Sequence, residues 1–120
     1  MAYDRNNIFA RILRGELPCT KVYEDDYCLA FHDISPQAPV HVLVIPKAEY
    51  VDFYSFASQA PADMVAGYMA GISKTARILG VEADGFRLIA NNGRDAGQIV
   101  DHLHFHICAG RDLGRMIAEE

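Results

Sequence analysis

The stretch Val100-Asp101-His102-Leu103-His104-Phe105-His106-Ile107-Cys108 decides how this chain folds and what it can do. Its three histidines occupy every second position and are separated by large apolar residues. Side chains of a strand alternate between the two faces of a sheet, so the pattern predicts a strand over residues 100–108. We expect the histidines on one face, available for chemistry, and the apolar residues on the other, packed in a core.

Three interpretations of this histidine face are open from the residues alone. His102, His104 and His106 could lie on a solvated strand face, although three in register serve no packing purpose. Two of them could bind a metal with a ligand from elsewhere, because the outer pair starts about 13 Å apart, too far for all three to reach one ion at about 2 Å. We favour the third, a metal-free site with one nucleophile and neighbours that donate and carry protons. Imidazole, with an unperturbed pKa near 6.5, is largely neutral at physiological pH. Ring dipoles and imidazolium charges on this face would both attract an anion.

Length and composition predict one soluble domain. The 120 residues are 51% hydrophobic and 22% charged, an apolar excess that favours an oligomer. The net charge of −5 and the pI near 5.4 argue against nucleic acid or an anionic membrane as partner. Cys19, Cys28 and Cys108 are odd in number and lack a C-x-x-C spacing, and neither a signal region nor a membrane-length apolar run is seen. We therefore expect a cytoplasmic, disulfide-free protein.

The rest of the chain predicts an α+β fold. Apolar spacing predicts a short amphipathic helix over residues 7–15 and the main helix from Pro61 to Leu79, each followed by a capping glycine. Further strands are expected over 21–24, 27–33, 40–46 and 86–91. Residues 47–58 read as loop or a single helical turn, and residues 111–120 as a short tail, possibly a frayed helix. Gly67 and Gly71 weaken an isolated helix by up to about 1 kcal/mol each, so a strand or a symmetry-related helix should approach there.

Three further features belong to a candidate site. Asp33 ends an apolar strand face, where it either caps the turn that follows or binds a ligand. His41 lies inside the buried strand 40–46 and is either a core histidine or part of the site. The glycine-punctuated segment 92–98 leads into the histidine strand and is either a phosphate cradle or a hairpin turn. Together they suit a nucleotide, yet the P-loop and G-x-G-x-x-G motifs are both absent.

The stretch His102-Leu-His-Phe-His-Ile-Cys108 resembles the H-φ-H-φ-H-φ-φ signature of the histidine-triad (HIT) proteins. Other stretches resemble the Hint branch of that family and extend the match over about residues 7–111: Ile8-Phe9, Tyr23–Asp25, Leu29–Pro39, His41, Val44–Lys47, and Asn91 with Gly97-Gln98. The resemblance implies a single HIT domain over residues 1–120 with a short C-terminal tail. It implies a HIT-like α+β fold, a five-stranded antiparallel sheet with two helices, and continuation of the sheet across a homodimer.

The same resemblance implies a hydrolase that cleaves the P–N bond of purine nucleoside 5′-phosphoramidates without a cofactor. His104 would attack the α-phosphorus and form a nucleotidyl-histidine that water resolves, while His102, His106 and His41 orient and protonate around it. The implied substrate-binding residues are Phe9, Phe31 and Ile34 at the base, Asp33 at the ribose, and Asn91, Gly97 and Gln98 around the phosphate and leaving group. The implied partner is a purine nucleoside monophosphate or its amidate. Two alternatives are a dinucleoside polyphosphate hydrolase of the Fhit type and a nucleotide-sensing interaction protein with incidental hydrolysis.

Three departures from the family pattern bear on specificity. Ile99 stands where many animal Hint proteins carry a serine, so a hydroxyl contact to the leaving amine is missing. Asn7 and Ala10 occupy the positions of the zinc-binding C-x-x-C of some bacterial relatives, so we expect no structural zinc. The tryptophan-containing C-terminus of the animal proteins is also missing, which leaves the leaving-group preference open.

Overall fold

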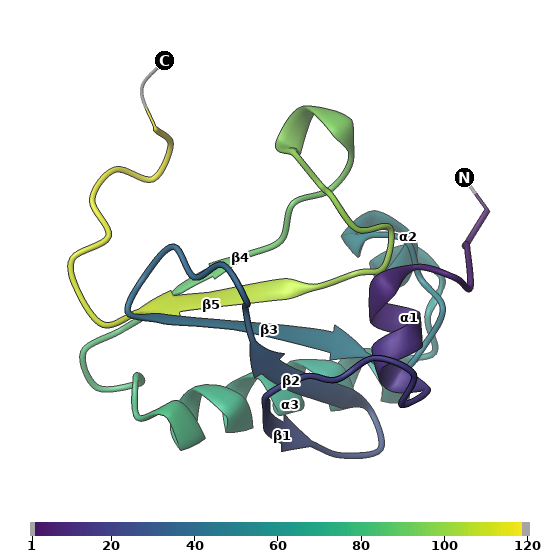
Figure 1. Ribbon diagram of the computed structural model, residues 1–120, viewed down its shortest axis with the longest axis horizontal. Helices are drawn as coiled ribbons and strands as arrows, with labels where there is room; N and C mark the ends of the chain where they lie inside the picture. Colours follow the sequence, from purple (N-terminus) through teal and green to yellow (C-terminus); the bar gives the residue numbers. More distant parts are fainter. Residues whose placement is uncertain (1, 119–120) are drawn as a thin grey trace.

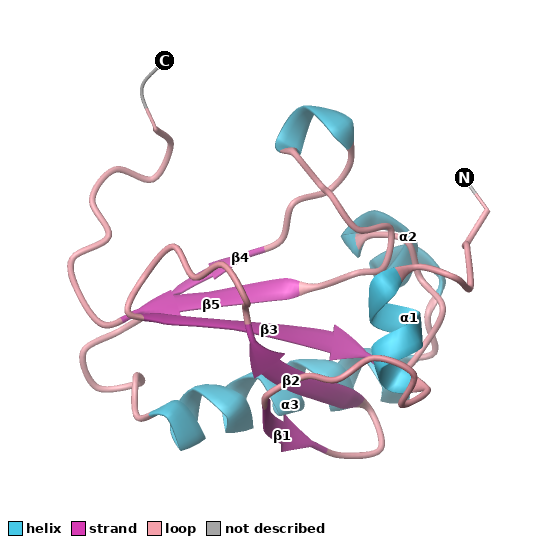
Figure 2. Ribbon diagram, in the orientation of Figure 1, coloured by secondary structure: helices cyan, strands magenta, loops and turns pink. Residues whose placement is uncertain are grey.

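The computed structural model describes residues 2–118, which fold around one five-stranded sheet (Figure 1). Its strands are β1 (Lys21–Glu24), β2 (Cys28–His32), β3 (Val40–Pro46), β4 (Arg87–Ile89) and β5 (Phe105–Ala109). They lie in the order β1-β2-β3-β5-β4, and every neighbouring pair is antiparallel (Figure 2). The expected sheet is confirmed, with the apolar strand β3 at its centre.

The two predicted helices pack on opposite faces of the sheet. On one face, α3 (Ala62–Leu79) buries Tyr68 and Ile72 against alternate strand residues: Ala30, Val42, Val44, Phe105 and Ile107. On the other face, α1 (Ile8–Leu13) buries Phe9 in a cluster with Leu29, Phe31, Leu43 and Ile45. Both predicted helices are confirmed, and Gly15 and Gly80 follow them with φ of 77° and 71°, the left-handed conformation that suits a C-terminal glycine. The short α1 leaves the rest of its face open.

The histidine stretch is a strand over only half of its predicted length. β5 begins at Phe105, whose partner in β3 is Val44, so His102 and His104 precede the ladder. The ladder begins late because the Leu103 N–H donates to the Tyr50 carbonyl at 2.9 Å and is therefore not available to a neighbouring strand. The alternation still holds, since Leu103, Phe105 and Ile107 all lie in the α3-side core.

A helix replaces the expected loop before α3. α2 (Phe53–Gln59) begins with a capping box, in which the Asp52 carboxylate accepts from the Ser55 N–H at 2.9 Å while the Ser55 hydroxyl faces the Asp52 N–H. Phe56 is the buried anchor of this helix and packs edge-on against Tyr68. The prediction of loop or a single turn for residues 47–58 was therefore wrong for the second half of that segment.

The two glycines of α3 make room for a hairpin of the same chain. A Cβ at Gly67 would lie 2.3 Å from the Tyr27 ring, and a Cβ at Gly71 would lie 2.3 Å from the Cys28 sulfur. Of the two expected neighbours, the strand is therefore the one found. These glycines give no support to a helix–helix interface between subunits.

The remaining segments shape the edges of the fold. β4 is shorter than the predicted strand 86–91, and the turn after it contains a 3₁₀ turn, η1 (Arg94–Ala96), which projects from the body. Residues 110–118 contain no helix, contrary to one expectation for the tail, and Arg87 holds them by donating to the Gly114 and Arg115 carbonyls. Within residues 2–118 no helix is both long and apolar enough to cross a membrane.

Candidate functional site

A cross-strand pair of histidines lies on the open part of the α1 face. His41 on β3 and His106 on β5 approach with His41 Nε2 and His106 Nδ1 2.9 Å apart. Asp33, which follows β2, places Oδ2 3.4 Å from the same His41 nitrogen. Its other oxygen, Oδ1, accepts from the Ser35 N–H at 2.8 Å. Asp33 thus caps the turn with one oxygen and faces the histidines with the other, so its binding of a ligand stays a prediction.

Hydrogen bonds fix the tautomers of this pair. The Gln37 backbone N–H donates to His41 Nδ1 at 3.0 Å, so the proton of a neutral His41 ring lies on Nε2 and is donated to His106 Nδ1. A neutral His106 ring then carries its own proton on Nε2. That nitrogen is buried and has no hydrogen-bond partner within residues 2–118. Buried donors are rarely left unpaired, so His106 Nε2 is a donor that awaits a ligand.

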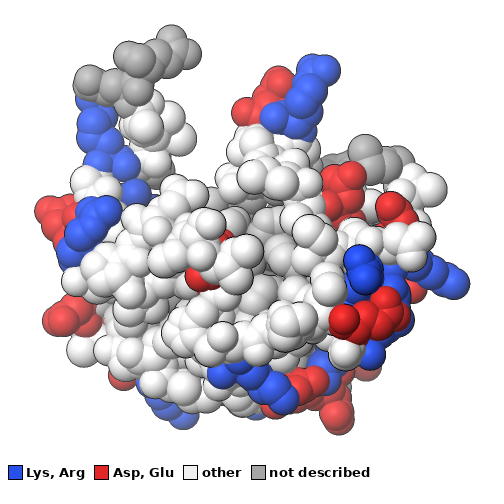
Figure 3. All heavy atoms as spheres, in the orientation of Figure 1, with Lys and Arg blue, Asp and Glu red and all other residues white. Residues whose placement is uncertain are grey.

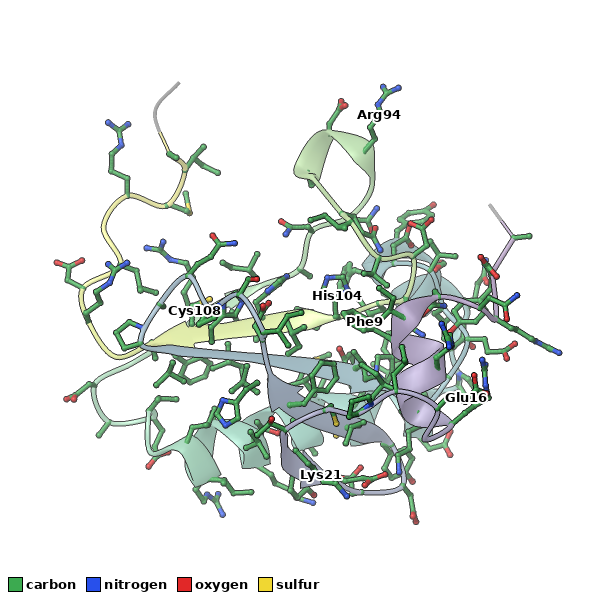
Figure 4. The ribbon with its side chains drawn as sticks, in the orientation of Figure 1. Phe9, Glu16, Lys21, Arg94, His104 and Cys108 are labelled. Carbon is green, nitrogen blue, oxygen red and sulfur yellow. The ribbon has the colours of Figure 1, made fainter. Side chains whose placement is uncertain are left out.

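His104 has the opposite arrangement and offers a lone pair. Its Nδ1 lies 2.8 Å from the carbonyl oxygen of His102, which can only accept, so Nδ1 carries the proton. Nε2 of the neutral ring is therefore unprotonated. The ring packs edge-on against Phe9 and His106, with centroids 5.0 and 5.1 Å apart, and Figure 4 shows His104 beside Phe9 at the α1 end of β5.

His102 has no free nitrogen. Nε2 donates to the Pro46 carbonyl at 3.0 Å, and Nδ1 accepts from the hydroxyl of Tyr3. The side chain is almost fully buried, at 1% exposure. The three histidines therefore differ, and only His104 and His106 keep a nitrogen for a ligand. Tyr3 was missed from the sequence, because an isolated tyrosine 99 positions from its partner gives no local signal.

The buried rings are neutral at physiological pH. Burial lowers the pKa of His102 and of His106 to about 4 each, and the neighbouring His104 and His41 add to the effect at His106. Burial also lowers the pKa of His104. The idea that imidazolium charges attract the anion is therefore wrong for the ligand-free protein at these three rings. An anion would be attracted by N–H dipoles, of which the one on His106 Nε2 is available.

The Asp33, His41 and His106 side chains are close enough to bind a metal, with one ligand atom from each within 4.8 Å of the others. A metal at His41 Nε2 would need the lone pair of that nitrogen. The Gln37 N–H makes Nδ1 the acceptor and puts the proton on Nε2. Binding would therefore require either an imidazolate ring, with no proton on either nitrogen, or loss of the Gln37 hydrogen bond, so the donor set favours a hydrogen-bond relay over a cation site.

The loop of residues 92–98, which leads into the histidine stretch, is held by hydrogen bonds within the protein. The Gln98 side chain accepts from the Gly93 N–H at 2.8 Å and donates to the carbonyls of Val51 and Val100 at 2.6 and 3.0 Å. The N–H of Gly97 donates to Arg94, and that of Gln98 to Gly93. These groups form a tight turn, the alternative to the phosphate cradle, so they could bind a substrate only by giving up an internal partner. Asn91 lies two residues after Ile89, whose ladder partner is His106.

The residues expected around the base differ in accessibility. Phe9 and Phe31 are buried and pack edge-on with ring centroids 5.7 Å apart, and Phe9 in turn packs against His104. Ile34 is 99% exposed and offers an apolar surface next to Asp33. Figure 3 shows this side of the molecule with charged side chains mainly at its rim and a hollowed, mostly uncharged centre.

Known proteins share both the sequence and the fold. A family model for the HIT domain matches residues 14–113. A HIT-like protein of Azospirillum brasilense is 53% identical over 117 residues, which are 98% of this chain and 96% of that protein. The structure of a HIT family hydrolase from Clostridium thermocellum superposes with a TM-score of 0.85 at 40% identity, covering 96% and 99% of the two chains. A histidine triad nucleotide-binding protein from Candida albicans gives 0.79 at 32% identity, covering 96% and 85%.

These matches confirm the resemblance at the level of the family and do not separate the Hint branch from the others, because the relatives carry family-level names. The matched region contains all five strands together with His41, His102, His104 and His106. By sequence and by fold, this chain belongs to the HIT domain family.

Proposed function

We propose that this protein is a hydrolase that cleaves the P–N bond of purine nucleoside 5′-phosphoramidates through a covalent intermediate on His104. One observation carries the proposal: His104 presents an unprotonated Nε2 on a neutral ring, and the neighbouring His106 presents an unpaired Nε2–H. A lone pair beside a donor is the arrangement that nucleophilic displacement at phosphorus needs.

The proposed reaction has two displacements. His104 Nε2 attacks the α-phosphorus, and the electron pair of the P–N bond leaves with the amine nitrogen. That nitrogen takes up a proton, which His106 Nε2 is placed to deliver, because the negative phosphate favours a protonated ring and opposes the effect of burial. Water then attacks the phosphorus, the electron pair of the P–Nε2 bond returns to His104, and the nucleoside monophosphate is released with the displaced water proton returned to solvent.

The nucleoside would lie across the open part of the α1 face. Ile34 offers an apolar surface to a purine, and Asp33 Oδ2 is an acceptor for ribose hydroxyls beside the histidine pair. Phe9 packs against His104 and Phe31 packs against Phe9, and both are buried rather than lining an open pocket. Asn91, Gly97 and Gln98 would act at the leaving-group side, with Gln98 mainly holding the loop in place.

The decisive experiment compares His104→Ala with His32→Ala. His32 is an exposed histidine at the end of β2 and has no place in the proposed site. With an AMP-amide as substrate, loss of the nucleophile should lower turnover by several orders of magnitude, while nucleotide affinity falls much less and His32→Ala behaves as wild type. Rapid acid quench and mass spectrometry should place an AMP adduct on the peptide that contains His104.

The same assays separate the alternatives. Faster turnover of diadenosine triphosphate than of the AMP-amide would favour a hydrolase of the Fhit type. Tight nucleotide binding with negligible turnover of every phosphoramidate would favour a nucleotide sensor. An adduct on His106 or His41, or full activity in His104→Ala, would refute the assigned nucleophile.

A homodimer is part of the proposal. β4 pairs with β5 on one side only, and Phe86 and Leu88 at this edge of the sheet are exposed. An unpaired edge with apolar side chains is a surface that proteins cover, and a second copy could extend the sheet there. Light scattering at micromolar concentration should give twice the chain mass, and a monomer mass would refute this part.

A further inference from the structure

We propose that Tyr3 is a positioning residue for the nucleophile, because its hydroxyl fixes the ring of His102, whose carbonyl in turn fixes the ring of His104. The inference rests on the proposed role of His104. Two successive contacts join these residues: Tyr3 O–H to His102 Nδ1, and His104 Nδ1–H to His102 O at 2.8 Å.

The direction of the first hydrogen bond follows from the second nitrogen of His102. Nε2 lies 3.0 Å from the Pro46 carbonyl, which can only accept, so the proton of the neutral ring is on Nε2. Nδ1 must then accept, and the Tyr3 hydroxyl is the donor. The two rings also pack edge-on, with centroids 5.6 Å apart. Tyr3 thus satisfies a buried nitrogen that water does not reach.

The segment that carries Tyr3 is held in place by its own contacts. Arg14 of the α1 C-cap donates to the Arg5 carbonyl at 2.7 Å, and Arg5 pairs with Glu49 at 3.1 Å. Asn7 donates to the Asp4 carbonyl at 2.8 Å while it caps α1. The N-terminal segment is therefore an ordered strap that delivers one hydroxyl to His102.

Without this hydroxyl, the Pro46 carbonyl still holds the ring proton on Nε2, but the buried Nδ1 lone pair loses its donor. The ring is then fixed at one nitrogen instead of two, and it can regain a partner for Nδ1 only by turning, which would move the ring and the adjoining backbone. That backbone includes the carbonyl that orients His104. The second consequence is that His102 is protonated more easily, because its Nδ1 no longer accepts a hydrogen bond from Tyr3. His102 faces Tyr3, His104 and a cavity of about 340 Å³, whose charged lining residues are Arg14, Lys47 and Glu49.

The test is Tyr3→Phe, which keeps the ring contact and removes only the hydroxyl, with Tyr54→Phe as the control at an exposed tyrosine. The ¹⁵N chemical shifts of the His102 and His104 rings report tautomers directly and need no turnover. We expect a changed His102 signal in Tyr3→Phe alone. We also expect the His104 adduct to form about tenfold more slowly in Tyr3→Phe than in the wild type, because misplacement of a reacting group is costly. KM should stay within twofold of the wild-type value. In the pH–rate profile, the loss of activity on the acid side should begin at a higher pH.

Unchanged ring signals together with adduct formation at the rate of Tyr54→Phe would overturn the proposal. A drop in rate with unchanged signals would also overturn it, because the hydroxyl would then act without fixing the ring. If the wild-type protein formed no adduct at all, the proposed reaction would fail, while the ring signals would still decide the role of Tyr3.

Discussion

Replacing Gly71 by alanine measures how closely α3 lies on the sheet that carries the site. The new Cβ would meet the Cys28 sulfur at 2.3 Å, although the Cys28 Cβ would be at an ordinary 3.6 Å, so a single atom causes the clash. Cys28 is fully buried and cannot swing away. Overpacking of this kind costs about 1–3 kcal/mol, and the helix propensity of alanine returns about 1 kcal/mol. We expect Gly71→Ala to lower the free energy of unfolding by the difference, up to about 2 kcal/mol.

A double-mutant cycle isolates the clash. Cys28→Ala alone should lower the free energy of unfolding by about 1 kcal/mol through the lost sulfur contacts. In the double variant the sulfur is gone and the helix propensity gain appears, so it should be at least as stable as Cys28→Ala. Urea unfolding under reducing conditions gives all four values, and the coupling should equal the cost of the clash, about 1–3 kcal/mol. Independent sites add within about 0.5 kcal/mol, so additivity would refute the close contact between α3 and β2.

Three other perturbations test the site. The free energy of unfolding should rise by at least about 3 kcal/mol between pH 4 and pH 6.5, because the unfolded chain binds protons that His102 and His106, each with a pKa of about 4, do not bind when folded; urea titrations across this range check it, and a flat profile would contradict it. Gln98→Ala should lower the free energy of unfolding by about 1–3 kcal/mol and speed amide exchange at Gly93, because the Gly93 N–H and the Val51 carbonyl each lose a hydrogen-bond partner. Dialysis against a chelator should leave phosphoramidate turnover unchanged, and a loss restored by zinc would contradict the proton assignment at His41.

Local patterns predicted much of the fold because their causes are local. The alternation of apolar residues assigned Leu103 and Ile107 to the core even though the strand itself starts late, since the face of a side chain depends on extended backbone and not on ladder hydrogen bonds. Gly67 and Gly71 of α3 likewise predicted the close approach of a neighbouring segment, which is the hairpin containing Tyr27 and Cys28. α2 was missed although Asp52 and Ser55 stand at cap spacing, because its aromatic sequence has no clear helical period.

The chemistry of the histidines depended on contacts that no pattern contains. The spacing placed three rings on one face without showing what each nitrogen contacts. Distant groups supply those contacts: Tyr3 and the Pro46 carbonyl hydrogen-bond to His102, and the Gln37 backbone sets the tautomer of His41. Their neutral state follows from burial, which is a property of the folded protein. The sequence therefore located the candidate site but did not say which nitrogen in it is a donor.

The source of the hydrogen bond to His41 has a consequence for mutational tolerance. The donor is the main-chain N–H of residue 37, which every amino acid except proline supplies, so the glutamine side chain is not needed for this contact. Position 37 should accept most substitutions in a saturation library and reject proline alone. The neighbours at positions 36 and 39 are already prolines, which stiffen the loop. A residue essential to the proton arrangement could thus vary freely among relatives, and a ranking of positions by side-chain identity would overlook it.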